Sequence, residues 1–170
     1  MFNLNMKAAV LGVLVLLVAS GCQTTEEIAD SVATAVHCPS EGVNFSKLFN
    51  QVYVVPFREG RAQKWAEAFA DDAVALHNRR PADIGNEKIA SFGKMVASTF
   101  RFGQYDVEVV DTRVGCNWAI SHGIFTTAFI FRETGEPAPW GPETGKFLIA
   151  WEYIDEDGWK IVADMGNTLE

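Results

Sequence analysis

Apolar side chains recur at helical spacing in the stretch that follows residue 41. One set predicts an amphipathic helix because its members fall at i, i+3, i+4, i+7 and i+8: Phe45, Leu48, Phe49, Val52 and Tyr53. Pro56 then kinks or ends this helix.

A second and a third helix follow from the same spacing. The second contains Ala62, Trp65, Ala66 and Phe69 and stops at Asp71-Asp72; we expect a short strand from Ala73 to His77 after it. Gly85-Asn86 offers a start for the third helix, whose expected buried face is Ile89, Phe92, Met95, Val96 and Phe100.

The remaining sequence has the character of a sheet. Segments 104–114, 118–131, 147–154 and 159–166 are rich in β-branched and aromatic residues, and turns rich in Gly, Asn or Asp separate them. Neighbouring strands should therefore pair antiparallel. Segment 118–131 is apolar at both parities, which predicts a central strand covered by helices on one face and by a further layer, such as a partner subunit, on the other. Residues 133–145 contain three prolines and predict a loop or lid. Helices first and strands afterwards indicate an α+β domain.

The N-terminus has the pattern of a targeting segment. Lys7 precedes an apolar run, Ala8 to Ala19, which is too short for the roughly 20 residues of a membrane-spanning helix but typical of a signal-peptide core. The sequence Val18-Ala19-Ser20-Gly21-Cys22 resembles the lipobox of bacterial lipoproteins, although Ala19 stands where Leu is usual; cleavage before an unmodified Cys22 is the alternative. By the same resemblance, Gln23 favours the outer membrane.

These features divide the chain into three parts. We expect a signal peptide at 1–21, a lipidated cysteine and tether at 22–40, and one domain at 41–170. The mature protein would then be exported and anchored by its lipid to the cell envelope, on the periplasmic face of the outer membrane. Cys38 and Cys116 would meet an oxidising compartment, where they form either a disulfide or two buried thiols.

Charge and composition narrow the class of ligand. The chain has 14 basic and 22 acidic residues and a formal net charge of -8, which disfavours nucleic acid as a partner. Aromatic residues make up 12% of the chain, so an aromatic-lined pocket would favour an apolar or aromatic small molecule. No nucleotide-binding, dinucleotide-binding, α/β-hydrolase or zincin motif occurs in the sequence, and no His or Cys pair has metal-ligand spacing; we therefore expect no cofactor and no metal.

Five segments in order carry a family resemblance. They are Trp65 to Leu76, Ile84 to Ile89, Asn117 to Ile120, Gly145 to Phe147 and Gly158 to Asp164. Together they resemble SnoaL-like domains of the nuclear transport factor 2-like superfamily over about residues 44 to 168. The resemblance implies a cone-shaped, cystatin-like fold in which three N-terminal helices lie against a curved antiparallel sheet and enclose a pocket. Members include isomerases, polyketide cyclases, dehydratases and binding modules, and they commonly form dimers.

The resemblance to ketosteroid isomerase suggests two catalytic candidates. That family uses a tyrosine, a carboxylate base and a protonated carboxylic acid in an apolar pocket. Its tyrosine corresponds to Tyr53 and its base to His77, whereas its third group falls near Trp151. An imidazole can act as a general base at neutral pH, and Arg79 and Arg80 would favour its neutral form. The alternatives are a strand-end His77 bonded to backbone and a Tyr53 that belongs to the core.

Other aromatic residues and a histidine are candidates for the pocket wall: Trp65, Phe69, Phe92, Trp118, His122 and Trp151. His122 is in register with Trp118 on the expected central strand and could instead be a core histidine. Three functions remain open: a lipid-anchored pocket that binds a small, largely apolar molecule; a cofactor-independent isomerase, cyclase or dehydratase that uses His77 and Tyr53; and a dimerisation or protein-interaction module.

Overall fold

The computed structural model describes residues 38–169. The predicted signal peptide, Cys22 and the tether up to residue 37 lie outside these residues. Among the described residues, no helix has both the length and the apolar character needed to cross a membrane.

The first helix is longer than the sequence predicted. Segments α2 (Phe45–Phe49), η1 (Asn50–Val54) and α3 (Val55–Arg58) follow one another without a break. The Asn44 side chain caps the start by accepting a hydrogen bond from the Lys47 N–H at 2.9 Å. Of the two alternatives for Pro56, the end of the helix is wrong, because Pro56 lies in the first turn of α3 and the helical segments continue to Arg58. The preceding π-helical turn, in which the Val55 N–H donates to the Asn50 carbonyl, accommodates a residue that has no N–H.

The second helix is shorter than expected and the next strand begins earlier. Helix α4 (Ala62–Ala66) ends before Phe69, which is the first residue of β1 (Phe69–Leu76). Asp71 and Asp72 are exposed within that strand and do not close a helix. Pairing with the last strand decides this boundary, since the Ile161 N–H donates to the Ala68 carbonyl at 2.8 Å.

The third helix begins where the sequence indicated. Strand β2 (Asp83–Ile84) precedes helix α5 (Asn86–Thr99), and Gly85 is its N-terminal flanking residue. Ile89 and Val96 are buried as predicted, but Met95 is 44% exposed. Phe100 is the first residue of the next strand.

The remaining strands lie in the expected places; β4 has the predicted bounds, and the other three are longer than predicted. They are β3 (Phe100–Val114), β4 (Trp118–Phe131), β5 (Glu143–Ile154) and β6 (Gly158–Thr168). The sheet order is β2-β1-β6-β5-β4-β3. Strands β3 to β6 pair antiparallel as predicted, whereas β1 and β6 are parallel. A hairpin fixes the direction of consecutive strands, but β1 and β6 meet from opposite ends of the domain, so no turn signal sets their direction.

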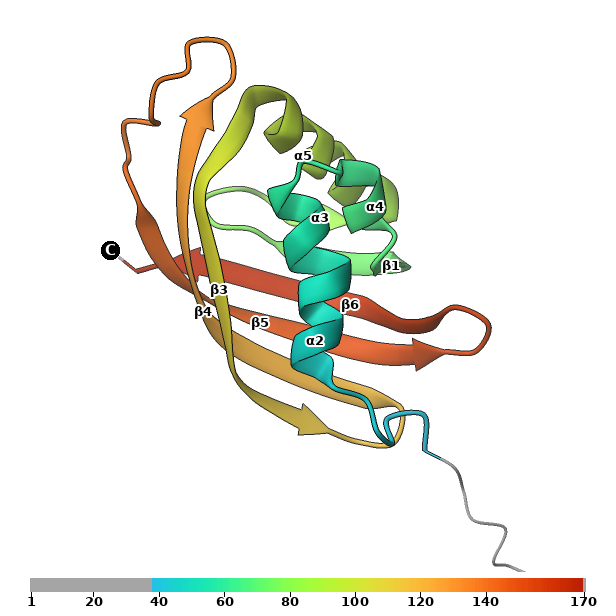
Figure 1. The fold of residues 1–170 in the computed structure, drawn as a ribbon. Helices are drawn as coiled ribbons and strands as arrows, with labels where there is room; N and C mark the ends of the chain where they lie inside the picture. The colour runs from blue at the N-terminus through green and yellow to red at the C-terminus, as the bar shows by residue number, and fades with distance from the viewer. Residues whose placement is uncertain (1–37, 170) are drawn as a thin grey trace, which may run out of the picture. The chain divides into compact units, whose positions relative to one another are not determined.

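The sheet curves around the helices, which lie on its concave face (Figure 1). The α+β class and the arrangement of N-terminal helices against a curved sheet are confirmed. The hydrophobic core includes the large aromatic residues Phe45, Phe49, Trp65, Phe69 and Trp151, all at most 4% exposed.

Strand β4 has one covered and one exposed face within the chain. Ala119 and Ser121 point to the concave face and are fully buried, whereas Trp118 is 47% and Ile124 is 44% exposed on the convex face. Helices cover one face as predicted, and the second covering layer, for which a partner subunit was suggested, stays a prediction. The convex face is the surface on which the predicted homodimer or partner protein would bind, and that prediction stays open.

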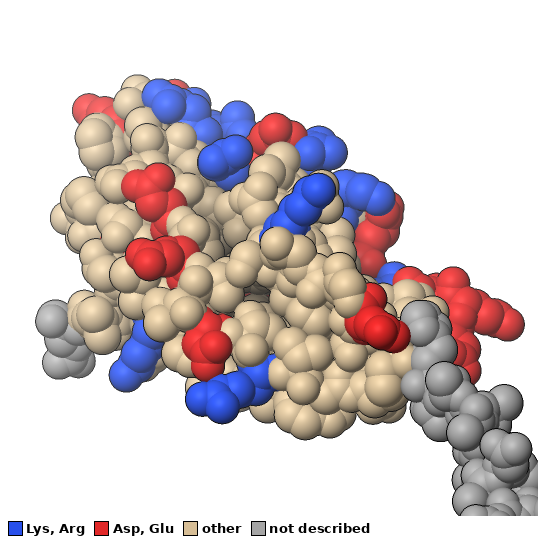
Figure 2. Space-filling view, turned by 60° about the horizontal axis from the view of Figure 1, so that its bottom comes forward, with Lys and Arg blue, Asp and Glu red and all other residues tan. Residues whose placement is uncertain are grey.

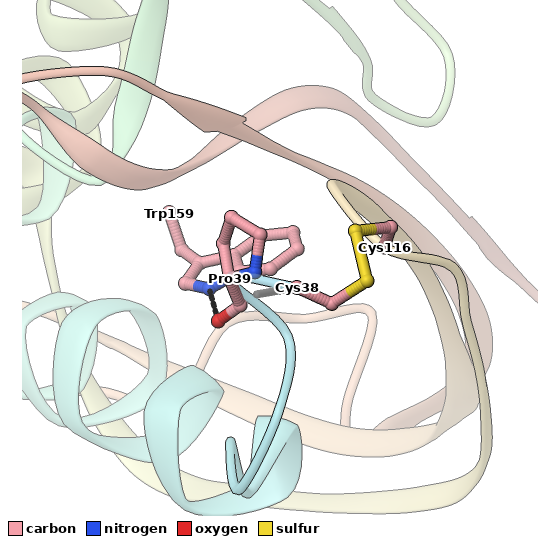
Figure 3. The surroundings of a disulfide bond; sticks show 4 residues. All are labelled: Cys38, Pro39, Cys116 and Trp159. Atoms are coloured by element: carbon pink, nitrogen blue, oxygen red, sulfur yellow. Dashed lines mark hydrogen bonds between the residues drawn. A yellow bond between two sulfur atoms is a disulfide. The ribbon is translucent and has the colours of Figure 1, made fainter. Parts of the chain in front are cut away.

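A disulfide joins Cys38 to Cys116 and so attaches the start of the domain to the turn between β3 and β4 (Figure 3). Next to it, the Trp159 indole N–H donates to the Pro39 carbonyl at 3.4 Å, and the Ser40 N–H donates to the Cys116 carbonyl at 3.2 Å. Of the two alternatives for the cysteines, the structure shows the bridge. Residues 38–40 thus belong to the folded domain and not to a tether.

Candidate functional site

A cavity of about 340 Å³ lies between the concave face of the sheet and the helices. Nearly half of its lining residues are aromatic, including Phe57, Phe92, Phe102, Phe125, Phe129 and Phe147. Polar groups enter at separate places: Tyr53 comes from η1, Asp164 from β6, and His77 from the residue that follows β1. The structure therefore brings both predicted catalytic residues to one cavity, together with a carboxyl group that the sequence analysis did not select.

Tyr53 and Asp164 form a hydrogen-bonded pair. The Tyr53 hydroxyl donates to Oδ2 of Asp164 at 2.8 Å, and Asp164 is only 4% exposed. Burial raises the pKa of Asp164 to about 6, although the Tyr53 hydrogen bond acts in the opposite direction. Burial and the neighbouring Asp164 charge raise the pKa of Tyr53 well above its usual value. Asp164 is therefore a carboxyl group that can change protonation near neutral pH.

Tyr105 is a second hydroxyl beside this pair. It lines the same cavity from β3, and burial, followed by the charge of Asp164, raises its pKa. The inner part of the cavity thus contains one titratable carboxyl group and two protonated phenols in apolar surroundings.

A β-bulge brings Asp164 to the concave face. Ala163 pairs with Ala150, but Ile161 pairs with Trp151, so Val162 is an extra residue in β6. Ile161 and Asp164 are consequently both buried although they are three positions apart, which strict alternation does not allow.

His77 is packed against an aromatic ring. It stacks on Phe92 with ring centroids 4.1 Å apart, and the Arg80 guanidinium lies 4.4 Å from the centroid of the same Phe92 ring. Its Nε2 atom is buried without a hydrogen bond and lies 4.0 Å from Oδ2 of Asp83. Burial lowers the pKa of His77 to about 4; the Asp83 charge raises the pKa and the Arg80 charge lowers it further. His77 is therefore neutral at pH 7 and is a weaker base than Asp164.

The loop after β1 forms part of the cavity mouth. The Arg79 guanidinium lies 3.8 Å from the Glu143 carboxylate at the start of β5. The Asn78 side-chain amide donates to the Thr168 hydroxyl of β6 at 2.7 Å. Trp140, from the predicted loop or lid at 133–145, also lines the cavity and is 46% exposed.

Of the six predicted wall residues, Phe92 alone lines this cavity. Trp65, Phe69 and Trp151 are core residues; the Trp151 indole N–H donates to the Ser121 hydroxyl at 3.2 Å. Trp118 and His122 lie on the exposed convex face, so both the pocket and the core interpretations of His122 are wrong. Both are at the alternate positions of β4 whose side chains point away from the helices. The sequence of β4 is apolar at both sets of alternate positions, so it does not reveal which set faces the helices.

The sequence analysis missed Asp164 and Tyr105. The available signal was an acidic residue at the end of the apolar segment Ile161 to Ala163. Charged groups are rarely buried without a partner, so a carboxylate in such a strand is a candidate for a special environment.

No group of three His, Cys, Asp or Glu side chains in residues 38–169 is arranged to hold a metal ion. On the face shown in Figure 2, basic and acidic side chains are interspersed around uncharged areas. That face has no continuous basic surface of the kind that binds a nucleic acid backbone.

Comparison with known proteins finds similarity in structure only. No family model matches the sequence, and no curated protein matches it. A ketosteroid isomerase-like protein from Erwinia carotovora atroseptica has a TM-score of 0.64 at 17% identity, covering 73% of this chain and 93% of that protein. A nuclear transport factor 2-like superfamily protein from Salmonella enterica has a TM-score of 0.58 at 18% identity, covering 71% of this chain and 85% of that protein.

A third similar structure is a nuclear transport factor 2-like protein of unknown function in nutrient uptake from Rhodospirillum rubrum. It has a TM-score of 0.60 at 17% identity and covers 73% of this chain and 98% of that protein. At identities this low, structural similarity establishes the fold alone, and the chemistry has to be argued from the residues of the site. From its architecture and from these similarities, the chain has the fold of the nuclear transport factor 2-like superfamily.

Proposed function

We propose that this chain is an exported, lipid-anchored envelope protein whose domain binds a small, largely apolar molecule in the cavity described above. One observation carries the binding part of the proposal: an aromatic-walled cavity of about 340 Å³ contains a buried hydrogen-bonding pair, Tyr53 and Asp164. Ligand sites are typically apolar cavities with a few polar groups that orient the ligand.

The anchoring part of the proposal rests on the sequence pattern up to Cys22. The Cys38–Cys116 disulfide supports export, because disulfides persist mainly in oxidising compartments outside the cytosol.

The Tyr53–Asp164 pair would orient a polar group of the ligand. Tyr53 donates to Oδ2, which leaves Oδ1 of Asp164 to meet the ligand. Above pH 6 the ionised carboxylate would accept a hydrogen bond from a ligand hydroxyl; below that pH the protonated form could donate to a carbonyl. Hydrogen bonds are stronger in such apolar surroundings than in water, so one polar group would contribute substantially to specificity.

The substitution Gly166→Val tests binding by filling the cavity. Gly166 lines the cavity, and a Cβ added there meets only a Phe125 ring carbon, at an ordinary contact distance of 3.8 Å. We expect calorimetry to show that 2-naphthol, a bicyclic phenol, binds the unmodified protein and binds Gly166→Val at least about tenfold more weakly. Thermal unfolding should show that the variant is folded.

Asn167→Val is the matched control, since Asn167 is the exposed next residue of β6. It should keep the affinity for 2-naphthol. Equal affinity of Gly166→Val and the unmodified protein, or no binding of 2-naphthol to either, would contradict the proposed function.

Proton transfer is a second candidate function, and the observation that favours it is the pKa of Asp164. A general base works best when its pKa lies near the working pH, and Asp164, at about 6, meets this condition better than His77, at about 4. In this version Asp164 takes the role of base that the sequence analysis gave to His77. The one O–H of Tyr53 donates to Asp164, so Tyr53 would turn it to the substrate to act as the predicted hydrogen-bond donor, and Tyr105 would supply a further hydroxyl in the same cavity.

Exchange of α-deuterium from the bicyclic ketone 2-tetralone, followed by NMR, tests this chemistry. The carboxylate of Asp164 would take a deuteron from the α-carbon, and the resulting enolate would regain a proton from the same carboxyl group after exchange with water. We expect Asp164→Asn to slow exchange at least about 100-fold and His77→Gln to slow it less than about threefold. The reverse order would assign the base to His77, and no exchange above the solvent rate would reject this second function.

A further inference from the structure

Two buried polar atoms at the mouth of the cavity have no hydrogen-bond partner. They are Nε2 of His77 and Oγ1 of Thr127, and both residues line the cavity. Buried polar atoms in folded proteins are nearly always satisfied. Nε2 of His77 has only Oδ2 of Asp83, itself without a hydrogen bond, at 4.0 Å, so both cavity atoms are free to donate to a polar group that arrives with a ligand. The Tyr53–Asp164 pair is already bonded internally and does not account for them.

A cation, Arg79, lines the same cavity as these two atoms. Thr127 is the cross-strand partner of Glu143, and Glu143 is the carboxylate nearest to the Arg79 guanidinium. His77 is two residues before Arg79 on the loop. A guanidinium, a hydroxyl and an imidazole, from Arg79, Thr127 and His77, therefore line the same cavity.

The two arginines of the loop are not equivalent. Arg80 has a close acidic partner, because its Nη2 atom lies 3.0 Å from Oδ1 of Asp83, and it also lies over Phe92. Arg79 approaches Glu143 only to 3.8 Å, which is longer than a hydrogen bond, and its side chain is 70% exposed. The guanidinium of Arg79 can thus turn toward an anion without losing a close contact.

The backbone holds Arg79 in an unusual conformation. Its φ angle is +59°, in the left-handed region that non-glycine residues seldom occupy. The hydrogen bond from Asn78 to Thr168 attaches the loop to β6 at the preceding residue. Conformations of this kind are concentrated at ligand sites, where the surrounding structure maintains them.

We infer that the ligand carries a carboxylate, which Arg79 binds at the mouth of the cavity while Thr127 and His77 donate hydrogen bonds to it. This inference rests on the proposed function, since the apolar body of the same ligand would occupy the aromatic part of the cavity. The ligand class is a small aromatic or alicyclic acid with a second polar group at its inner end. A guanidinium with two further donors suits the two oxygens of a carboxylate. Glu143 would act as the internal competitor that the ligand carboxylate displaces.

Three naphthalene probes test the inference by calorimetry at pH 7.5. They are 6-hydroxy-2-naphthoic acid, its neutral methyl ester and naphthalene-2,6-diol, which share a ring system and a hydroxyl group. We expect the acid to bind at least about tenfold more tightly than either neutral probe, and we expect this preference to shrink in high salt.

Two variants at the mouth should change the preference in opposite directions. Arg79→Gln should remove the preference for the acid and leave the affinity for the ester within about twofold, whereas Glu143→Gln should increase the preference severalfold by removing the competing carboxylate. Lys146→Gln is the matched control, because it makes the same change of charge as Arg79→Gln at an exposed position of β5 outside the cavity wall. It should keep the preference.

The outcomes separate this inference from the proposed function. If the neutral probes bind and the acid has no advantage, or if Arg79→Gln keeps the advantage, the carboxylate site is wrong while the apolar binding function stands. If none of the probes and no 2-naphthol bind, both fail. Because Glu143→Gln should move the preference upward, the test does not depend on Arg79→Gln alone.

Discussion

Replacing both Cys38 and Cys116 by Ser should lower the free energy of unfolding by about 4 kcal/mol. The bridge spans 78 residues, and cross-linking a loop of that length restricts the unfolded chain by about this amount of free energy. Loss of the disulfide should also loosen residues 38–40. The hydrogen bond between Trp159 and Pro39 depends on the position of the chain next to Cys38. Urea unfolding, followed by tryptophan fluorescence, measures both effects.

A reductant provides the matched comparison. It should destabilise the unmodified protein by a similar amount and leave the double variant unchanged. A loss of less than about 1 kcal/mol would show that the closed loop contributes little and that the packing of Trp159 and Phe45, whose ring centroids are 4.8 Å apart, holds this end of the domain without the bridge.

Asp164→Asn should make the domain more stable at pH 8, by up to about 3 kcal/mol. Burial raises the pKa of Asp164 from 3.8 to about 6, so the folded state disfavours the ionised carboxylate; each pKa unit corresponds to about 1.4 kcal/mol. The contribution of the protonated group to stability is complete below pH 3.8 and is lost as the pH rises through 6. The advantage of the variant should therefore vanish at pH 3.5 and grow between pH 4 and 6, as urea unfolding at several pH values can measure.

Protonation of His77 changes the free energy of unfolding in the opposite direction to protonation of Asp164, over much the same pH range. Its pKa is lowered from 6.5 to about 4, so the stability associated with its neutral form is present above pH 6.5 and is lost as the pH falls through 4. In the unmodified protein the two contributions largely cancel between pH 4 and 6. Asp164→Asn should expose the loss due to His77, and the double variant with His77→Gln should be nearly independent of pH in this range.

Asp72→Asn is the control for the Asp164 variant, because Asp72 is exposed on β1. It should change stability by less than about 0.5 kcal/mol at either pH. If Asp164→Asn destabilises the domain at pH 8, the hydrogen bond between Tyr53 and the carboxylate is worth more than the cost of burying the charge. Higher stability combined with weaker ligand binding would identify Asp164 as a group retained for function at the expense of stability.

The order and type of the main elements followed from local pattern. The spacing from Phe45 to Tyr53 defined the buried face of the first helix, and the segments rich in β-branched and aromatic residues located β3 to β6. These features depend on neighbours within one or two turns of helix or along one strand, which the sequence displays directly. The family resemblance then supplied the curved sheet and the enclosed cavity.

The site depended on features that local pattern does not contain. Tyr53 and His77 were placed by resemblance, and the structure brings both to the cavity, but their roles stay predictions. Asp164 reaches the same cavity because Val162 bulges out of β6, and one extra residue exchanges the two faces of a strand. The direction in which Trp118 and His122 point was equally undetermined, because both parities of β4 are apolar.

The sequence by itself determined that the chain forms an α+β domain with amphipathic helices and a run of strands, because hydrophobic periodicity records which local structures can bury apolar surface. Only the tertiary structure decided that Cys38 meets Cys116, that Tyr53 donates to Asp164, and that Arg79 stands at the cavity mouth. Each of these depends on a register or a contact between segments far apart in the chain, and a shift of one residue would replace every group involved.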